Sequence, residues 1–184
     1  MRIIAGTHRG TRLKEPAEVT RPTSDRVREA IFNVLRHVVP EARVLDLFAG
    51  TGALGLEALS RGARSCHFVE REAQALRCLH DNLRHTGFST AKVIADDALA
   101  YLARVGEEAQ YDLILADPPY YRDGAPDLAS PLWEKPLPLA AGGIVMVEVE
   151  AERETPEDPP FLTLVKRKNY GKTTVLYFEA KSSS

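Results

Sequence analysis

The chain has 184 residues, 44% of them hydrophobic, which is enough to bury the core of one ordinary domain. No segment approaches the roughly 18 consecutive apolar residues of a membrane span, and the first ten residues lack the apolar core of a signal peptide. Cys66 and Cys78 have neither a CxxC spacing nor His-rich surroundings. We therefore expect a cytoplasmic protein with no disulfide framework, no membrane contact and no bound metal.

The net charge of −2 hides an uneven distribution along the chain. Residues 1–36 hold eight Lys and Arg against four Asp and Glu, and residues 161–184 hold five against one. The segment between them therefore carries an excess of acids. Solvated faces of differing sign would explain this pattern as well as basic ends that contact phosphates, so it favours a nucleic-acid partner without establishing one.

Two elements are predicted before the first buried strand. Residues 2–14 alternate apolar and basic residues around Gly6 and Gly10, a pattern typical of a β-hairpin arm. A helix is then predicted over 24–39, since Thr23, Ser24 and Asp25 are N-cap candidates and apolar residues follow at helical spacing up to Pro40. We place the boundary between a basic arm (1–22) and the main domain (23–184) here.

The rest of the chain alternates short apolar strands with helices. Strands are predicted at 44–48, 66–69, 92–95, 113–116 and 144–149, and helices at 53–60, 72–85, 98–104 and near 128–140. A closing hairpin pairs 161–168 with 173–179 across a turn at 169–172. Continuous apolar strands separated by helices indicate an α/β fold with a mostly parallel, seven-stranded sheet covered on both faces.

A glycine-rich turn follows the first predicted strand of the sheet. Gly50 and Gly52 lie between that strand and a helix, where glycine permits a tight turn and close approach of a ligand to free backbone N–H groups. Tight turns also use glycine for packing alone, so the pattern is weak by itself. The turn matches neither GxGxxG nor GxxxxGK[ST], which disfavours a dinucleotide or a triphosphate. Asp46 would repel a pyrophosphate but suit a cationic amino-acid group.

Acidic residues end the next two predicted strands. Glu70 is eighteen residues beyond Gly52, close to the roughly 20-residue spacing of a ribose-binding acid. Asp97 ends the third strand and is placed to accept a hydrogen bond from an amino group of a base; Asp96 is the alternative residue for this role. Open α/β sheets bind ligands at the carboxyl ends of their strands, so these acids predict a nucleoside site.

The fourth strand ends in Asp117-Pro118-Pro119-Tyr120. Two prolines remove two N–H donors and leave carbonyls that can only accept. An exocyclic amine is a poor nucleophile, and acceptors around it favour the pyramidal form that can attack a methyl group. We expect Asp117 and the Pro118 carbonyl to be these acceptors and Tyr120 to stack on an unstacked base. The alternative without a catalytic role is a stiff loop that carries a surface tyrosine.

These two turns resemble those of the Rossmann-like class I methyltransferases, which bind S-adenosyl-L-methionine (AdoMet) and release S-adenosyl-L-homocysteine. The resemblance implies that Asp117-Pro118-Pro119-Tyr120 is the [DNS]PP[YFW] signature of amino-group methyltransferases, with these four residues catalytic. It also implies that the first turn faces the methionine portion, Glu70 the ribose and Asp97 the adenine. The cofactor-binding residues would be Asp46, Phe48, Ala49, Gly50, Thr51, Gly52, Glu70, Arg71, Asp97 and Ala98.

A narrower resemblance covers nearly the whole chain. MRIIAGTHRGTRL, TRPTSDRVREAIFNVL, FAGTGALGLEALSRGA, DPPY and YGKTTVLYF are similar, in this order, to the RsmD family of bacterial methyltransferases. This implies a monomer that methylates the guanine N2 amine in 16S ribosomal RNA, packed with ribosomal proteins in a 30S subunit or assembly intermediate. We expect the RNA contacts to come from Arg2, His8, Arg9, Arg12, Arg21 and Arg26.

Two other functions remain open at this stage. One is the same chemistry on adenine N6 of DNA or RNA, which the prolyl turn does not exclude. The other is a non-catalytic protein that senses AdoMet or binds ribosomes; Asp117 and Tyr120 speak against it, because binding alone needs neither.

Overall fold

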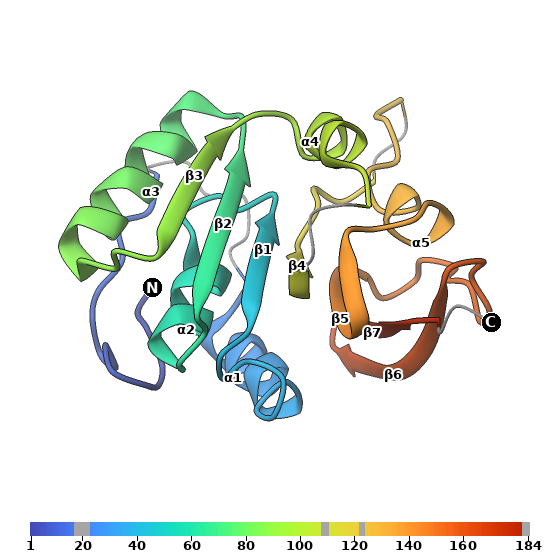
Figure 1. Cartoon of the computed structure of the whole chain (residues 1–184), viewed down its shortest axis with the longest axis horizontal. Coiled ribbons are helices and arrows are strands. Elements are labelled where there is room, and N and C mark those ends of the chain that lie inside the picture. The colour runs from blue at the N-terminus through green and yellow to red at the C-terminus, as the bar shows by residue number, and fades with distance from the viewer. Residues whose placement is uncertain (17–22, 108–110, 122–123, 182–184) are drawn as a thin grey trace.

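The computed structural model describes all of the chain except residues 17–22, 108–110, 122–123 and 182–184. Its main element is a seven-stranded sheet (Figure 1). The strands are β1 (Arg43–Leu47), β2 (Ser65–Glu70), β3 (Ala91–Ala95), β4 (Tyr111–Ala116), β5 (Leu139–Glu150), β6 (Leu162–Tyr170) and β7 (Thr173–Ala180). All seven predicted strands are present, and most extend a residue or more beyond their predicted ends.

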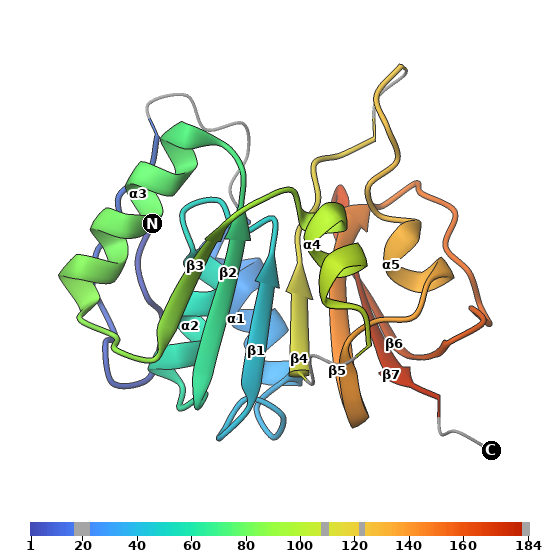
Figure 2. The ribbon, with the colours of Figure 1, turned by 45° about the horizontal axis from the view of Figure 1, so that its top comes forward.

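The strand order is β3-β2-β1-β4-β5-β7-β6. The first five strands in this order are parallel, whereas β7 is antiparallel to both β5 and β6. The predicted mostly parallel sheet with an antiparallel C-terminal hairpin is therefore confirmed (Figure 2). The chain order reverses between β1 and β4, which is where ligands bind in open sheets of this type.

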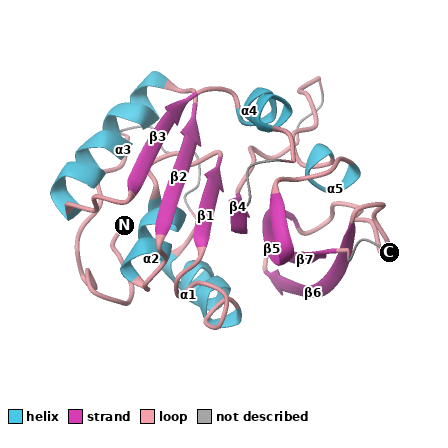
Figure 3. Cartoon of the chain, in the orientation of Figure 1, coloured by secondary structure: helices cyan, strands magenta, loops and turns pink. Residues whose placement is uncertain are grey.

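Helices cover both faces of the sheet (Figure 3). They are α1 (Asp25–Val34), α2 (Ala53–Ser60), α3 (Ala73–Thr86), α4 (Ala98–Val105) and α5 (Pro131–Glu134). The first three contribute to one hydrophobic core, and α4 and α5 contribute to a second core on the opposite face. None of the described helices is long and apolar enough to cross a membrane.

Two predicted helices, α1 and α5, are shorter than expected. α1 ends at Val34 instead of residue 39, and the chain continues in turns in which the N–H groups of Val38 and Val39 both bond to Leu35. Pro40 disfavours a helical conformation only at Val39, so it does not account for the end of α1 at Val34. The helix expected near 128–140 is only the four residues of α5, because Pro136 and Pro138 cannot extend it. β5 accordingly begins at Leu139.

The N-terminal arm packs into the body of the protein. A single antiparallel bridge joins Arg2 and Arg12, so the arm is hairpin-like, with no named strand of its own. Ile3 and Leu13 are 1% and 6% exposed and belong to the same core as α1, α2 and α3. The described part of the arm, residues 1–16, thus shares a core with the domain, while the proposed boundary at residue 22 stays a prediction.

A buried ion pair lies beneath this arm. The side chains of Arg28 (α1) and Glu57 (α2) are both 0% exposed. Glu57 accepts hydrogen bonds from the backbone N–H groups of Ile4 and Ala5, at 2.8 and 3.1 Å, and Arg28 donates to the carbonyl of Arg2. Burial lowers the pKa of Arg28, and the nearby Glu57 carboxylate partly offsets this effect. The pair therefore fixes the start of the arm onto two helices.

Candidate active site

A cavity of about 880 Å³ opens at the carboxyl ends of the parallel strands. It reaches from β3, across the ends of β2, β1 and β4, to the turn between β6 and β7. The predicted site residues in its wall are Phe48, Glu70, Arg71, Asp97, Ala98, Asp117, Pro118, Pro119 and Tyr120. The structure thus gathers the predicted nucleoside site and the predicted amine site in one cavity.

The glycine turn after β1 is conformationally demanding. Phe48, Gly50 and Gly52 have φ values of 57°, 56° and 84°, all in the left-handed region. At Gly52 an added Cβ would also lie 2.5 Å from Leu79 Cδ1 on α3, so this glycine serves packing, whereas a Cβ on Gly50 would meet nothing within 4 Å. None of the turn residues Ala49, Gly50, Thr51 and Gly52 lines the cavity itself, and their cofactor role stays a prediction.

Asp46 lies within β1 and not in the turn, which corrects its predicted placement. Asp46 is buried, with only 1% of its surface exposed, and its Oδ2 accepts a hydrogen bond from the Gly55 N–H of α2 at 2.9 Å. Burial raises the pKa of Asp46 well above its ordinary value, and Asp117 and Glu70 nearby add to this effect. Asp46 therefore joins the end of β1 to the first turn of α2, behind the glycine turn.

Backbone N–H groups from two segments, the glycine turn and the residues that directly follow β2, hold the Glu70 carboxylate. Its Oε2 accepts from the Gly50 N–H at 2.7 Å, and its Oε1 accepts from the N–H groups of Arg71 and Glu72, both at 2.8 Å. A carboxylate has about four acceptor sites, so one remains for a further donor. This side chain links β2 to the glycine turn and presents a fixed negative charge to the cavity.

Both acids after β3 line the cavity, but they are held differently. Asp97 caps α4, since its Oδ1 accepts from the N–H groups of Leu99 and Ala100, and its Oδ2 is 3.2 Å from Arg71 Nη1. Asp96 pairs with Arg104 at 2.7 Å, and this hydrogen bond lowers the pKa of Asp96. Asp97 is thus the acid that the start of α4 fixes in position, two residues beyond the end of β3, and its contact with a base amino group stays a prediction.

The prolyl turn brings a further carboxyl group, that of Asp117, into the cavity. Asp117 follows β4, and its Oδ2 accepts from the Thr23 hydroxyl at 3.1 Å. The same hydroxyl lies 2.8 Å from Oε2 of Glu148 on β5. Loss of hydration raises the pKa of Asp117 to about 8, and the charge of Glu148 adds to the shift. The Tyr120 hydroxyl is 2.7 Å from Thr173 Oγ1, which holds the ring against the turn after β6.

Sequence reasoning did not single out Thr23 and Glu148 as site residues. Thr23 was noted only as a possible helix cap, although Ser24 is the residue whose side chain caps α1. Glu148 is an acid in an otherwise apolar buried strand and is 5% exposed. A buried charge requires a partner, so this exception to the apolar pattern was the available signal. Among the residues whose placement is described, no cluster of His, Cys, Asp and Glu could hold a metal ion.

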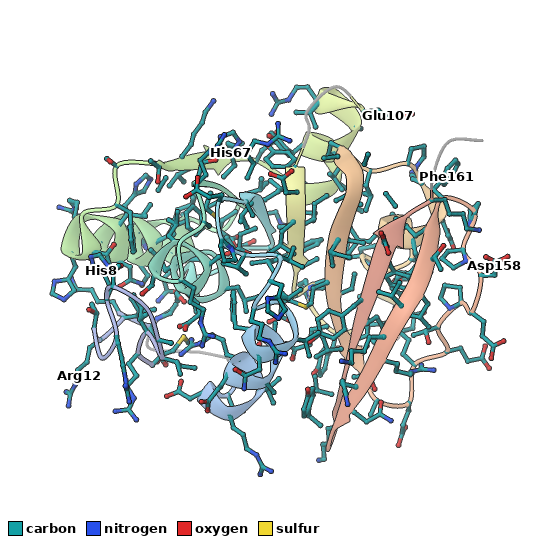
Figure 4. All side chains as sticks on the ribbon, turned by 60° about the horizontal axis from the view of Figure 1, so that its bottom comes forward. His8, Arg12, His67, Glu107, Asp158 and Phe161 are labelled. Atoms are coloured by element: carbon teal, nitrogen blue, oxygen red, sulfur yellow. The ribbon has the colours of Figure 1, made fainter. Side chains whose placement is uncertain are left out.

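None of the described residues that were predicted to contact RNA lines the cavity. Arg2, Arg9, Arg12 and Arg26 are exposed, and Arg21 lies outside the described residues. Figure 4 shows Arg12 pointing away from the body of the protein and His8 beside α3. The His8 ring packs on Phe88 with centroids 4.3 Å apart, and its Nε2 is 2.9 Å from the Thr86 carbonyl oxygen. His8 thus anchors the arm, and its contact with RNA stays a prediction.

Solved structures show the same architecture. One from Escherichia coli, assigned provisionally as the methyltransferase yhhF, is 35% identical with a TM-score of 0.85, and the match covers 100% of this chain and 99% of that one. A 16S rRNA guanine-N2 methyltransferase of Thermus thermophilus, solved with AdoMet and guanosine, is 24% identical with a TM-score of 0.68 over 90% of this chain and 44% of that one. The fold and the site define a Rossmann-like methyltransferase, the class whose methyl donor is AdoMet.

Sequence comparison narrows this class to one family. Residues 1–179 match the family described as "Conserved hypothetical protein 95". The ribosomal RNA small subunit methyltransferase D of Escherichia coli is 36% identical over 183 residues, which are 99% of this chain and 91% of that protein. The chain belongs to this family of rRNA methyltransferases, the RsmD family.

Proposed function

We propose that this protein transfers a methyl group from AdoMet to the N2 amine of a guanine in 16S rRNA. We propose further that it acts as a monomer on a 30S subunit or an assembly intermediate that already carries ribosomal proteins. The observation that supports the reaction is that Glu70 and Asp97 share one cavity with the Asp117–Tyr120 turn. A nucleoside-type donor and a base bearing an amine can therefore meet at the ends of β1 and β4.

The residues of the cavity suit AdoMet. Glu70 retains acceptor capacity for a ribose hydroxyl, and Asp97 can accept from the adenine amino group. Phe48 provides an apolar wall near both acids, and the backbone of residues 49–52 would face the methionine portion. We assign Asp46 a supporting role, because it is buried behind the turn and holds it through Gly55. When bound, AdoMet supplies a methyl group on a sulfonium cation and leaves as a neutral thioether.

The prolyl turn would prepare the nucleophile. Asp117 and the Pro118 carbonyl would accept the amine hydrogens, which directs the nitrogen lone pair out of the plane of the base. The Tyr120 ring, held through Thr173, would stack on the base, a contact worth about 1–3 kcal/mol. These groups would promote the reaction mainly by positioning the amine in line with the methyl group.

The buried carboxyl group of Asp117 would also handle the proton that the alkylated nitrogen must lose. In the empty cavity its pKa of about 8 favours the protonated form at neutral pH. A cation in the cavity would favour the ionised form, and the loss of that cation during transfer would favour protonation again. Asp117 would therefore be ionised before methyl transfer and take up the amine proton after it.

The choice of an RNA in a ribonucleoprotein rests on the shape and charge of the protein. The arm shares the domain core, so the described residues form no separate RNA-binding module. The exposed arginines of the arm and α1 would contact phosphates, but a net charge of −2 supplies only a weak general attraction to RNA. Recognition would then depend on the folded shape of the particle.

A labelling experiment tests this function. The protein is incubated with radiolabelled AdoMet and, separately, with naked 16S rRNA, 30S particles or duplex DNA, and the modified base is mapped. We expect label on guanine N2, and more on 30S particles than on naked RNA. Label on adenine, or on DNA alone, would refute the proposed substrate; no transfer to any of them would favour a binding protein without catalysis.

A variant of Asp117 tests the proposed mechanism. We expect Asp117→Ala to lower the transfer rate by at least about 100-fold, the usual contribution of a positioned acid or base. AdoMet affinity should stay within a few fold, because the adenine and ribose acids are unchanged. Asp112→Ala is a suitable control, since this acid begins the same strand and pairs with Arg43 away from the cavity. An intact rate in Asp117→Ala would refute the role given to this carboxylate.

A further inference from the structure

Asp117 and Glu148 form a carboxyl pair joined by one hydroxyl group. The register of β4 and β5 places Ala116 beside Val147, so the next residues of the two strands, Asp117 and Glu148, lie side by side. Both line the cavity, and Thr23 Oγ1 is within hydrogen-bond distance of one oxygen from each. The methyl-transfer chemistry proposed above uses Asp117 but gives no task to Glu148.

The contacts of Thr23 define how many protons this cluster holds. A hydroxyl group has one hydrogen to donate and can accept two hydrogen bonds. Thr23 therefore cannot donate to both carboxylates at once, and both contacts are satisfied when one carboxyl group is protonated and donates to Thr23. Thr23 then donates onward to the other carboxylate. Burial raises the pKa of Asp117 to about 8, and the charge of Glu148 adds to this shift, which is the effect of two carboxyl groups lying close together.

Glu148 beside Asp117 offers a second carboxyl acceptor at the site where the amine would bind. Guanine presents its exocyclic amine next to a ring N–H, so two donors lie side by side on one edge. Adenine and cytosine present their amine next to a ring nitrogen that is itself an acceptor. A second carboxylate would bond to the guanine edge and repel the other two.

We infer that Glu148 selects guanine by accepting a hydrogen bond from the ring N1–H while Asp117 accepts from the N2 amine. This inference rests on the proposed function and explains which amine the site takes. Thr23 keeps the two acceptors at a set separation, because its single oxygen contacts both. The prolyl turn alone does not distinguish the bases, so the base preference would come from β5 and from the residue that precedes α1.

The test compares guanine with 2-aminopurine, which carries the same exocyclic amine beside a ring acceptor in place of the N–H. Once the target nucleotide is mapped, 30S particles are reconstituted with either base at that position, and initial rates are measured. We expect the wild-type protein to prefer guanine by roughly 10- to 100-fold, the discrimination typical of one well-formed base contact. An equal rate on 2-aminopurine would overturn the inference at once, without any variant.

Glu148→Gln is the decisive variant, because its amide can turn its NH₂ group toward a ring acceptor. We expect the preference for guanine to fall to about threefold or less, whereas Glu148→Asp, which keeps a carboxylate, should preserve the preference at a lower rate. Glu150→Gln is the matched control on the same face of β5 and should leave the ratio unchanged, since Glu150 does not line the cavity. Thermal melting and AdoMet binding verify that each variant is folded.

The possible outcomes separate this inference from the proposed function. Methylation of guanine N2 with an unchanged guanine preference in Glu148→Gln would refute the role of Glu148 and leave the function standing. Methylation of adenine by the wild-type protein would refute the function itself. If Glu148→Gln does not fold, loss of the guanine preference in Glu148→Asp would count against the inference, because that variant keeps the acceptor.

Discussion

Gly50 and Glu70 are joined by a hydrogen bond of 2.7 Å from the backbone N–H to Oε2. The bond links the turn after β1 to the end of β2, so the charge expected to hold the ribose also sets the position of the turn expected to hold the methionine portion. The part of the site expected to hold the ribose and the part expected to hold the methionine portion are therefore coupled. A change in Gly50 or Glu70 should affect both parts.

Glu70→Ala should weaken AdoMet binding by roughly 10- to 100-fold, because it removes a charge-assisted acceptor and leaves three backbone N–H groups without their partner. Isothermal titration calorimetry measures the change in Kd. Glu41→Ala, which removes an exposed acid beside Arg64, is the control and should have no effect. A Glu70 variant that bound AdoMet normally would show that this carboxylate is not part of the cofactor site.

AdoMet binding should depend on pH through Asp117. Its pKa is about 8 in the empty cavity, and a bound cation lowers it, so binding releases a proton and affinity rises as the pH increases toward 8. Titrations in two buffers of different ionisation enthalpy measure this proton release. The amino group of AdoMet also titrates near this range, so the comparison with Asp117→Asn isolates the contribution of the protein. Identical pH profiles for both proteins would contradict the assignment.

The buried pair of Arg28 and Glu57 should matter more for stability than any surface pair. Glu57→Gln places a donor against the N–H groups of Ile4 and Ala5 and removes the buried charge that Arg28 and Arg61 contact, so we expect the free energy of unfolding to fall by about 3–5 kcal/mol. Chemical denaturation measures this loss. Glu41→Gln, which breaks the exposed pair with Arg64, should lower stability by less than about 1 kcal/mol. Equal effects would show that burial of the pair is unimportant.

The arm should contribute to the salt dependence of RNA binding. Arg9 and Arg12 are both exposed on the arm. If each contacts one phosphate, the double variant Arg9→Ala and Arg12→Ala should lower the slope of log K against log salt by roughly 1.4 to 1.8. Arg36→Ala with Arg64→Ala changes the same number of exposed charges elsewhere and should leave the slope unchanged. Filter binding to 30S particles measures both slopes, and an unaltered slope in the arm variant would place the arm outside the interface.

Local pattern was sufficient for the order of the elements and for much of the site. The apolar runs predict all seven strands, and residues at or just after the ends of those strands, among them Glu70, Asp97 and Asp117, line the cavity. This succeeds because parallel strands present their carboxyl ends at the same edge of a sheet, so a residue's place at the end of a strand implies its place in space. The ends of α1 and α5 were less well predicted, and at α5 the prolines that follow the helical pattern shorten it.

Other features depend on contacts between residues far apart in the chain. Asp46 reads as a residue of the glycine turn, but the pairing of β1 with β2 and β4 buries it, and it bonds to α2. Glu148 enters the site only because β5 pairs in register with β4, and Thr23 only because α1 packs so that its first residues reach the cavity.

The sequence by itself therefore determined the order of strands and helices along the chain, the class of reaction and the acidic residues proposed for it. These features depend on local periodicity and on residues at strand ends. Only the tertiary structure decided that the arm shares the core and that Asp117 has Glu148 as a neighbour. The contacts between the arm and Glu57 join residues 52 and 53 positions apart, and Asp117 and Glu148 are 31 positions apart, so no local pattern carries information about either.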